Sequence, residues 1–156
     1  MKVIFLDVDG VLNSNDTEDI FKGFIGLDYS GIKLLREVVD ATSAEIVLVS
    51  SWKHRWYKDA KDHQDNLANY LDQRLAEEGL KIIDKTEGSS DRGTGIIDWM
   101  SKHDVESWAV LDDEIFKDYE ECGILPHLVK TSFYDGGLKD KHIELAIKIL
   151  NKGEKL

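Results

Sequence analysis

The chain has 156 residues, of which 42% are hydrophobic, enough to bury the core of one domain that we expect to span residues 1–156. The sequence holds neither an apolar run of the ~20 residues that cross a bilayer nor the hydrophobic region of a signal peptide, so we expect a cytoplasmic protein. A formal net charge of −11 opposes strong non-specific binding to nucleic acid and favours a small substrate or a short terminus. The single cysteine, Cys122, has no cysteine partner for a disulfide or a zinc site, so any metal is expected to be held by oxygen.

Short apolar runs typical of strands alternate with segments of helical spacing along the chain. The predicted strands are residues 3–7, 46–50, 81–83, 108–111 and 127–130. Three predicted helices carry apolar side chains three or four positions apart, at Ile32, Leu35 and Val39, at Leu67, Leu71 and Leu75, and at Ile143, Ile147 and Leu150. A fourth is predicted at residues 96–100. This alternation predicts an α/β fold, a doubly wound, Rossmann-like, five-stranded and mostly parallel sheet with helices on both faces.

Residues 13–31 form a long connection between the first strand and the first helix, polar at its start and then aromatic. This insert is too short for a helical cap domain, and residues 52–91 are largely used by a helix and the third strand. We therefore expect a mobile flap, a minimal cap and a fairly open site.

The first predicted strand ends in two carboxylates, Asp7 and Asp9, followed by Gly10. Because side chains alternate along a strand, both carboxylates can share one face at the carboxyl edge of the sheet, where α/β folds bind ligands. Gly10 lets the backbone turn sharply away from these carboxylates. We also assign three residues to substrate binding, namely Gly10, Ser51 and Lys53. Two carboxylates this close repel each other unless a cation lies between them or one takes a proton. The alternative is a solvated turn with capping aspartates.

Two further predicted strands end in polar residues at the same edge. Ser50 and Ser51 follow the second strand, where a hydroxyl group and backbone amides suit a phosphate oxygen. The fourth strand is followed by Asp112, Asp113 and Glu114. Carboxylates from several strand ends are the hard oxygen ligands that Mg²⁺ prefers. Glu114 is either an outer ligand or the cap of a following helix.

A transferring phosphoryl group also requires a cationic side chain, and Arg92, just before the predicted helix, is placed to supply it. Lys85 and Lys102 are the alternatives. Lys53 and Arg55 are either substrate contacts or ordinary surface cations.

Aromatic residues follow the second motif directly, namely Trp52, Trp56 and Tyr57. They form either a stacking platform for a base or the packing that holds this loop to the domain. The five histidines lack metal-binding spacing, so we expect them on the surface or in packing.

In this order, the motifs resemble those of the haloacid dehalogenase (HAD) superfamily of phosphatases and phosphotransferases. The similarity comprises Asp7-Val8-Asp9-Gly10-Val11, Ser50, a basic residue and Asp112-Asp113, and it spans almost the whole chain. More narrowly, Ser-Ser-Trp-Lys, Arg-Gly-Thr-Gly-Ile-Ile-Asp-Trp, Leu-Asp-Asp-Glu and the stretch from Thr131 to Leu138 resemble the small HAD domains grouped with Swiss Army knife RNA-repair proteins, a group common in phages. The third-motif cation is usually Lys in the superfamily, whereas here it is assigned to an arginine.

The resemblance implies that Asp7 is the nucleophile and forms an aspartyl-phosphate, while Asp9 protonates the leaving oxygen and then activates water. It implies Mg²⁺ as cofactor, bound by Asp7, the Val8 carbonyl, Asp9, Asp112 and Asp113. The implied phosphate-binding residues are Ser50, Ser51 and Arg92.

The expected function is Mg²⁺-dependent hydrolysis of a phosphomonoester, on a nucleotide or the phosphorylated end of a nucleic acid. One alternative is a phosphotransferase that passes the phosphoryl group to a sugar or nucleoside. Another is a non-catalytic module that binds Mg²⁺ and phosphate and regulates a partner. A response-regulator receiver domain also has an acidic pocket, but its phosphorylated aspartate comes from the third strand, which here ends at Ile83-Asp84 without matching partners.

Overall fold

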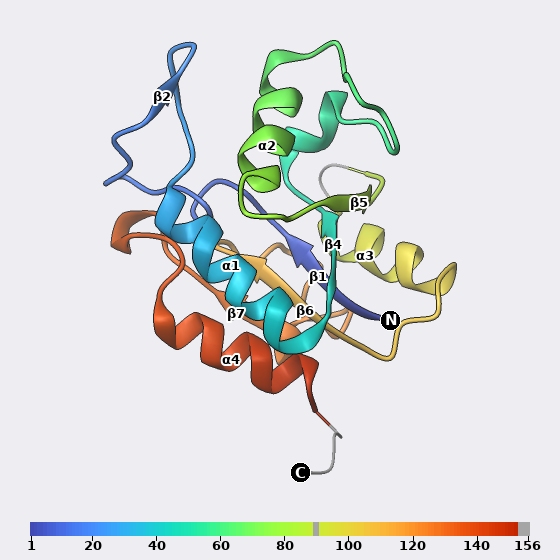
Figure 1. Cartoon of the computed structure of the whole chain (residues 1–156). Coiled ribbons are helices and arrows are strands. Elements are labelled where there is room, and N and C mark those ends of the chain that lie inside the picture. Colours follow the sequence, from blue (N-terminus) through green and yellow to red (C-terminus); the bar gives the residue numbers. More distant parts are fainter. Residues whose placement is uncertain (89–90, 153–156) are drawn as a thin grey trace.

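A five-stranded parallel sheet forms the centre of the structure, a computed structural model that describes residues 1–88 and 91–152 (Figure 1). The strands lie in the order β5-β4-β1-β6-β7, and every pairing between neighbours is parallel. Their bounds are Lys2–Leu6 for β1, Glu45–Leu48 for β4, Ile82–Lys85 for β5, Ser107–Asp112 for β6 and Leu128–Lys130 for β7. The predicted doubly wound α/β fold is confirmed.

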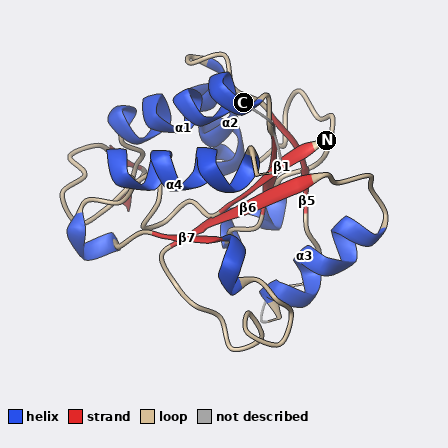
Figure 2. Cartoon of the chain, turned by 90° about the horizontal axis from the view of Figure 1, so that it is seen from below, coloured by secondary structure: helices blue, strands red, loops and turns tan. Residues whose placement is uncertain are grey.

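Helices cover both faces of this sheet (Figure 2). Their bounds are Tyr29–Thr42 for α1, Asn66–Ala76 for α2, Arg92–Ser101 for α3 and Asp140–Leu150 for α4. Alternate residues of β1 explain the two layers, because Ile4 and Leu6 pack in one core with α1, α2 and α4, whereas Val3 and Phe5 pack in a second core with α3. The central strand is thus buried on both sides, as parallel strands require.

The observed bounds differ from the predicted ones at the carboxyl edge. Strand β4 ends at Leu48 rather than residue 50, because Ser50 caps a short 3₁₀ helix, η1 (Ser51–Arg55). Strand β5 extends to Lys85, beyond the predicted end at residue 83. Two more 3₁₀ turns, η2 (Leu125–His127) and η3 (Phe133–Asp135), flank β7. Among the described residues, no helix has the length and apolar character needed to span a bilayer.

The predicted flap contains a small antiparallel hairpin, β2 (Ile20–Phe21) and β3 (Phe24–Ile25), which rises beside α2 (Figure 1). Residues 29–31, the last part of the predicted flap, belong instead to α1. Phe21 stacks on Tyr70 of α2 with ring centroids 4.2 Å apart, and the Tyr70 hydroxyl accepts a hydrogen bond from the Leu27 backbone. The hairpin therefore rests on α2 through one aromatic pair, while its mobility stays a prediction.

Candidate active site

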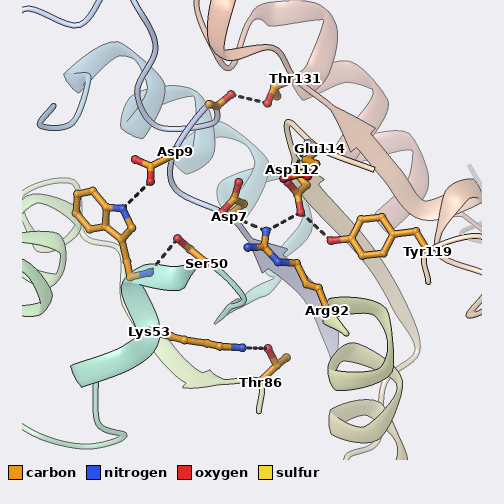
Figure 3. A network of polar contacts seen from close by, with 12 residues as sticks. Asp7, Asp9, Ser50, Lys53, Thr86, Arg92, Asp112, Glu114, Tyr119 and Thr131 are labelled. Atoms are coloured by element: carbon orange, nitrogen blue, oxygen red, sulfur yellow. Dashed lines mark hydrogen bonds and ion pairs between the residues drawn. The ribbon is translucent and has the colours of Figure 1, made fainter. Parts of the chain in front are cut away.

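The carboxyl ends of β1, β4 and β6 bring the predicted site residues to one edge of the sheet (Figure 3). Asp7 directly follows β1, and its backbone N–H continues the ladder by donating to the Leu111 carbonyl at 2.9 Å. Asp112 is the last residue of β6, the strand beside β1. This register places the two aspartates next to each other. The chain runs from β1 outward to β4 and β5 on one side and continues through β6 and β7 on the other, so the aspartates lie where the strand order reverses.

Three carboxylates form an acid cluster, Asp7, Asp112 and Asp113, and one oxygen atom from each lies within 4.8 Å of the other two. Asp7 and Asp112 are buried, and Asp113 is half-buried. Burial, and then the negative charge of Asp112, raise the pKa of Asp7 to about 8. The same two causes raise the pKa of Asp113 above its ordinary value. The cluster can hold a metal ion, because oxygen ligands gathered against their own repulsion fit a hard divalent cation.

The structure brings Arg92 to this cluster from the first position of α3. Its Nη1 lies 2.8 Å from Asp112 Oδ2 and 3.3 Å from Asp7 Oδ1, so one guanidinium bridges the ends of two strands (Figure 3). Phe116, in the loop after β6, packs its ring 4.0 Å from the guanidinium carbon. A planar group is suited to both the bridging and the ring contact.

The two alternative cations lie elsewhere. Lys102, beyond the end of α3, is mostly exposed and pairs with Asp98 at 3.2 Å. The Lys85 amine donates to the Lys53 carbonyl at 3.0 Å and has no ion pair with the acid cluster among the described residues. Arg92 is therefore the cation that contacts the cluster.

A tyrosine that the sequence reasoning missed completes the surroundings of Asp112. The hydroxyl of the fully buried Tyr119 donates to Asp112 Oδ2 at 2.7 Å. The Glu114 backbone N–H donates to Oδ1 of the same carboxylate at 3.0 Å, within the described turn that follows β6 rather than in a helix. Burial, with the charge of Asp112, raises the pKa of Tyr119 far above its usual range, so the phenol keeps its proton and remains a donor.

Asp118 ties this loop to the helix that carries Arg92. Its carboxylate accepts hydrogen bonds from the backbone N–H groups of Gly93 at 3.0 Å and Thr94 at 2.9 Å, the free donors of the first turn of α3. Although burial pushes its pKa upward, the hydrogen bonds from Thr94 and Gly93 hold the pKa of Asp118 below its ordinary value. The cap of α3 thus comes from the loop after β6 and not from Asp91, which makes no side-chain cap.

The structure does not place the Asp9 side chain in the acid cluster. Asp9 Oδ1 accepts from Asn13 Nδ2 at 2.9 Å and Asp9 Oδ2 accepts from Trp52 Nε1 at 3.0 Å, which turns the carboxylate toward η1 (Figure 3). A side-chain role for Asp9 in metal binding is therefore not supported by this geometry. The second carboxylate stands apart from the first, held by two neutral donors.

The backbone groups of Val8 and Gly10, predicted to contact metal and substrate, already make hydrogen bonds within the protein. The Val8 carbonyl accepts hydrogen bonds from Val11 at 3.1 Å and Leu12 at 2.8 Å, so the turn already uses the oxygen that was assigned to the metal. The N–H of Gly10 donates to Asn13 Oδ1 and its carbonyl accepts from the Thr131 hydroxyl. Both polar groups of Gly10 are occupied, which leaves it a steric role and removes the reason to assign it to substrate binding.

That steric role is plain from the backbone of Gly10, which has a φ of +81°. A Cβ at this position would lie 2.2 Å from Asp113 Oδ2, well inside van der Waals contact. The glycine therefore makes room for a member of the acid cluster.

Ser50 lies where the sequence places it, buried at the start of η1. Its Oγ accepts from the Trp52 backbone N–H at 3.2 Å, so the hydroxyl hydrogen remains available for donation. Ser51 is exposed at the first position of η1. Lys53 is buried, not a surface cation, and its amine donates to the Thr86 hydroxyl at 3.1 Å.

The aromatic residues after Ser50 divide between packing and the site. Trp56 is buried and donates to Asp72 at 2.9 Å, which is a packing role. Trp52 is 8% exposed, holds Asp9, and lines a pocket of about 370 Å³. The other residues of this pocket are Asp9, Gly23, Phe24, Ile25, Leu67 and Phe133.

The family model of the HAD domain in Swiss Army Knife RNA repair proteins matches residues 3–143. The chain belongs to this family. No curated protein and no solved structure shows a significant match to the sequence. The match covers the whole acid cluster and, apart from Lys2 at the start of β1, every strand of the sheet, so membership of this HAD family agrees with the geometry of the site.

In this HAD domain, the predicted residues are oriented by side chains that the sequence reasoning missed and by Trp52, which it had assigned to base stacking or packing. Asn13 and Trp52 hold Asp9, Tyr119 and Phe116 hold Asp112 and Arg92, and Thr131 holds the turn at Gly10. Trp52 and Asn13 stand within four residues of a recognised motif, which is a usable signal. Tyr119 and Phe116 lie in an irregular loop whose path no local pattern specifies.

Proposed function

We propose that this HAD domain is a Mg²⁺-dependent phosphomonoester hydrolase that acts through an aspartyl-phosphate on Asp7. The observation that carries the proposal is the Arg92 guanidinium, shared between Asp7 at 3.3 Å and Asp112 at 2.8 Å. A cation at the carboxylate that attacks is suited to the phosphoryl oxygens as charge moves in the transition state. Family membership and the acid cluster support the same reaction class.

The acid cluster fits the proposed cofactor. Three carboxylates face one guanidinium, so when all are ionised the cluster carries about two uncompensated negative charges. When bound by Asp7, Asp112 and Asp113, Mg²⁺ supplies charge screening between the carboxylate and the phosphate dianion. Arg92 and the Tyr119 hydroxyl keep Asp112 oriented for that task.

In the first step, a carboxylate oxygen of Asp7 forms a bond to phosphorus while the bond from phosphorus to the ester oxygen breaks. Asp9 donates its proton to the departing oxygen, which leaves as the alcohol. Trp52 and Asn13 hold the Asp9 carboxylate in place for this transfer. Ser50 donates its free hydroxyl hydrogen to a phosphoryl oxygen.

In the second step, Asp9 takes a proton from a water molecule whose oxygen attacks phosphorus. The bond between phosphorus and Asp7 breaks, so inorganic phosphate leaves and both carboxylates return to their starting states. Asp9 thus acts first as acid and then as base.

We propose a nucleotide or the phosphorylated end of a nucleic acid as the substrate. The apolar pocket beside Asp9 is lined by Trp52, Phe24 and Phe133, side chains that suit a nucleobase. The hairpin β2-β3 lines this pocket through Gly23, Phe24 and Ile25, so the proposed chain end enters beside the hairpin.

A single experiment separates this function from its alternatives. Wild-type protein and Asp7→Asn are incubated with radiolabelled phosphomonoesters in Mg²⁺ or EDTA, with and without added acceptor alcohols, and the products are resolved. We expect inorganic phosphate from the wild type in Mg²⁺, a label trapped on the protein, and neither from Asp7→Asn because an amide cannot form the phosphoryl-enzyme. Transfer of most label to the alcohol would instead identify a phosphotransferase. Binding without turnover would identify a regulatory module.

A further inference from the structure

A second pocket, which we call the basic pocket, adjoins the acid cluster and is lined by several cations. It has a volume of about 570 Å³. Its lining residues are Val49, Ser51, Lys53, His54, Lys85, Thr86, Glu87, Gly88 and Arg92. Because Arg92 both lines this pocket and contacts Asp7, the pocket opens next to the proposed nucleophile.

Lys53 is the most unusual of these residues. It is only 9% exposed, and its amine donates to the Thr86 hydroxyl at 3.1 Å (Figure 3). Among the described residues, no carboxylate lies within ion-pairing distance of this amine. A buried ammonium group with only a neutral partner is costly unless an anion joins it. Burial, followed by the positive charge of Arg92, lowers the pKa of Lys53 to about 8.

Lys85 adds a second cation that lacks a carboxylate partner among the described residues. Its amine donates to the Lys53 carbonyl at 3.0 Å and lies 5.1 Å from the centre of the Tyr57 ring. The one acidic residue among the lining residues, Glu87, is exposed. Among the described lining residues, Lys53 and Lys85 thus face this space with one exposed carboxylate, while Arg92 is already paired with Asp7 and Asp112.

Elsewhere on the described chain, the lysines that pair with carboxylates are exposed, as Lys58 is beside Asp84 and Lys102 beside Asp98, whereas Lys53 is buried. The protein carries 31 acidic residues against 20 lysines and arginines, so carboxylates are abundant. Two neighbouring lysines without a carboxylate partner among the described residues, one of them buried, indicate in so acidic a protein a site for an anion supplied from outside.

We propose that the basic pocket binds a second phosphate group of the substrate, beside the phosphomonoester that is hydrolysed. This inference rests on the proposed function, since it extends the site of Asp7 to its neighbour. Lys53 and Lys85 provide the charge, the Thr86 hydroxyl orients the Lys53 amine, and Arg92 lies between the two phosphates. The substrate class is then a nucleoside bisphosphate or a nucleic-acid end whose next phosphodiester enters the pocket.

The kinetic test compares three substrates: adenosine 5′-monophosphate, adenosine 3′,5′-bisphosphate and a 5′-phosphorylated adenosine dinucleotide. We expect kcat/KM to rise by about tenfold or more for at least one substrate with a second phosphate, which is about 1.4 kcal/mol of added binding. Preference for the dinucleotide identifies a nucleic-acid end, and preference for the bisphosphate identifies a nucleotide. Lys85→Gln and Lys53→Met should each remove that preference, while Lys102→Gln, a lysine outside the pocket, should retain it.

Equal losses for the monophosphate and the second-phosphate substrates in both lysine variants would overturn the proposal, because the pocket would then serve only the hydrolysed phosphate. Equal kcat/KM for all three substrates in the wild type would overturn it as well. Circular dichroism verifies that Lys53→Met is folded, and the half-exposed Lys85 gives the independent variant should that protein be destabilised.

A binding test keeps this inference distinct from the proposed hydrolysis. Calorimetry in EDTA measures adenosine 3′,5′-bisphosphate and adenosine 5′-monophosphate binding to Asp7→Asn, with and without Lys85→Gln. We expect the bisphosphate to bind about tenfold more tightly than the monophosphate, and Lys85→Gln to abolish the difference. Equal affinities would overturn the second-phosphate site. Tighter bisphosphate binding by Asp7→Asn, together with no hydrolysis of any of the three substrates by the wild-type protein in Mg²⁺, would retain the site and overturn the proposed function.

Discussion

Trp52 Nε1 donates a hydrogen bond of 3.0 Å to Asp9 Oδ2, so the residue two positions after Ser50 fixes the carboxylate two positions after Asp7. Strands β1 and β4 are parallel neighbours, and the residues that follow them therefore meet across the sheet edge. The contact couples two motifs that are more than 40 residues apart in the sequence.

Trp52→Phe should lower kcat by about tenfold or more, because it keeps an aromatic ring but removes a hydrogen bond to a charged group, worth about 1.5–3 kcal/mol. Steady-state kinetics with a small phosphomonoester measures the effect. Trp56→Phe is the matched control, since that indole donates to Asp72 and makes no contact with Asp9. Equal losses of kcat in the two variants would contradict a positioning role for Trp52.

Arg92→Ala should lower kcat by a factor of about 10² or more, the scale of one lost preorganised donor. Arg92→Lys should recover part of the rate, because an ammonium restores charge without the planar bridge between Asp7 and Asp112. Lys102→Ala serves as the control on the same side of the sheet. A larger loss from Lys102→Ala than from Arg92→Ala would show that the third-motif cation is misassigned.

Removal of the metal should abolish turnover, and Mg²⁺ should restore it. Ca²⁺ should support little turnover, because it takes more ligands at longer distances and in a less rigid geometry. Asp113→Asn should raise the Mg²⁺ concentration for half-maximal activity by about tenfold or more. Glu114→Gln makes the same chemical change at the next residue, whose side chain lies outside the acid cluster, and should leave that concentration unchanged. Full activity in EDTA would exclude a metal-dependent reaction.

Gly10→Ala should destabilise the fold and weaken Mg²⁺ binding, because the new Cβ would meet Asp113 Oδ2 at 2.2 Å. Gly23→Ala provides the comparison, since Gly23 has a similar φ of +84° but nothing within 4 Å of a built Cβ. Both variants carry the cost of a left-handed backbone, about 1–2 kcal/mol. Denaturant unfolding should show a clearly larger loss at Gly10, and equal losses would leave the steric role of this glycine unsupported.

The stability of the metal-free protein should fall as the pH rises from about 4 to 8. Asp7 has a pKa raised from 3.8 to about 8, so the folded state holds a proton in this range that the unfolded state has released. Stability from this group is complete below pH 4 and is lost through the window, by about 1.4 kcal/mol per unit of pKa shift. Asp7→Asn should flatten this slope in thermal or denaturant unfolding in EDTA. An unchanged slope in Asp7→Asn would assign it to other groups.

Much of the fold could be predicted from the sequence because each strand is a short apolar run between amphipathic helices. Parallel strands force their following residues to one edge, which is why Asp7, Ser50 and Asp112 were recognisable as neighbours before their distances were known. Arg92 was predicted just before a helix at residues 96–100, and the structure starts that helix earlier, with Arg92 at its first position.

The orientation of side chains was harder to predict from the sequence. Alternation along an ideal strand put Asp9 on the same face as Asp7, but the chain leaves strand geometry after Leu6 and the turn closed by Val11 and Leu12 redirects it. Hydrophobic pattern also gave Lys53 no reason to be buried. Its place depends on the 3₁₀ helix η1, a short element with no periodic signal.

The carboxylate of Asp118, in the loop after β6, caps α3. Arg92 directly precedes the capped turn, and Tyr119 directly follows Asp118. If that loop swings away from the sheet, the first turn of α3 loses its acceptor at the same moment. The arginine and the tyrosine then leave Asp112 together, and the buried charge becomes uncompensated in one event. We therefore expect this edge of the domain to open and close as one cooperative unit.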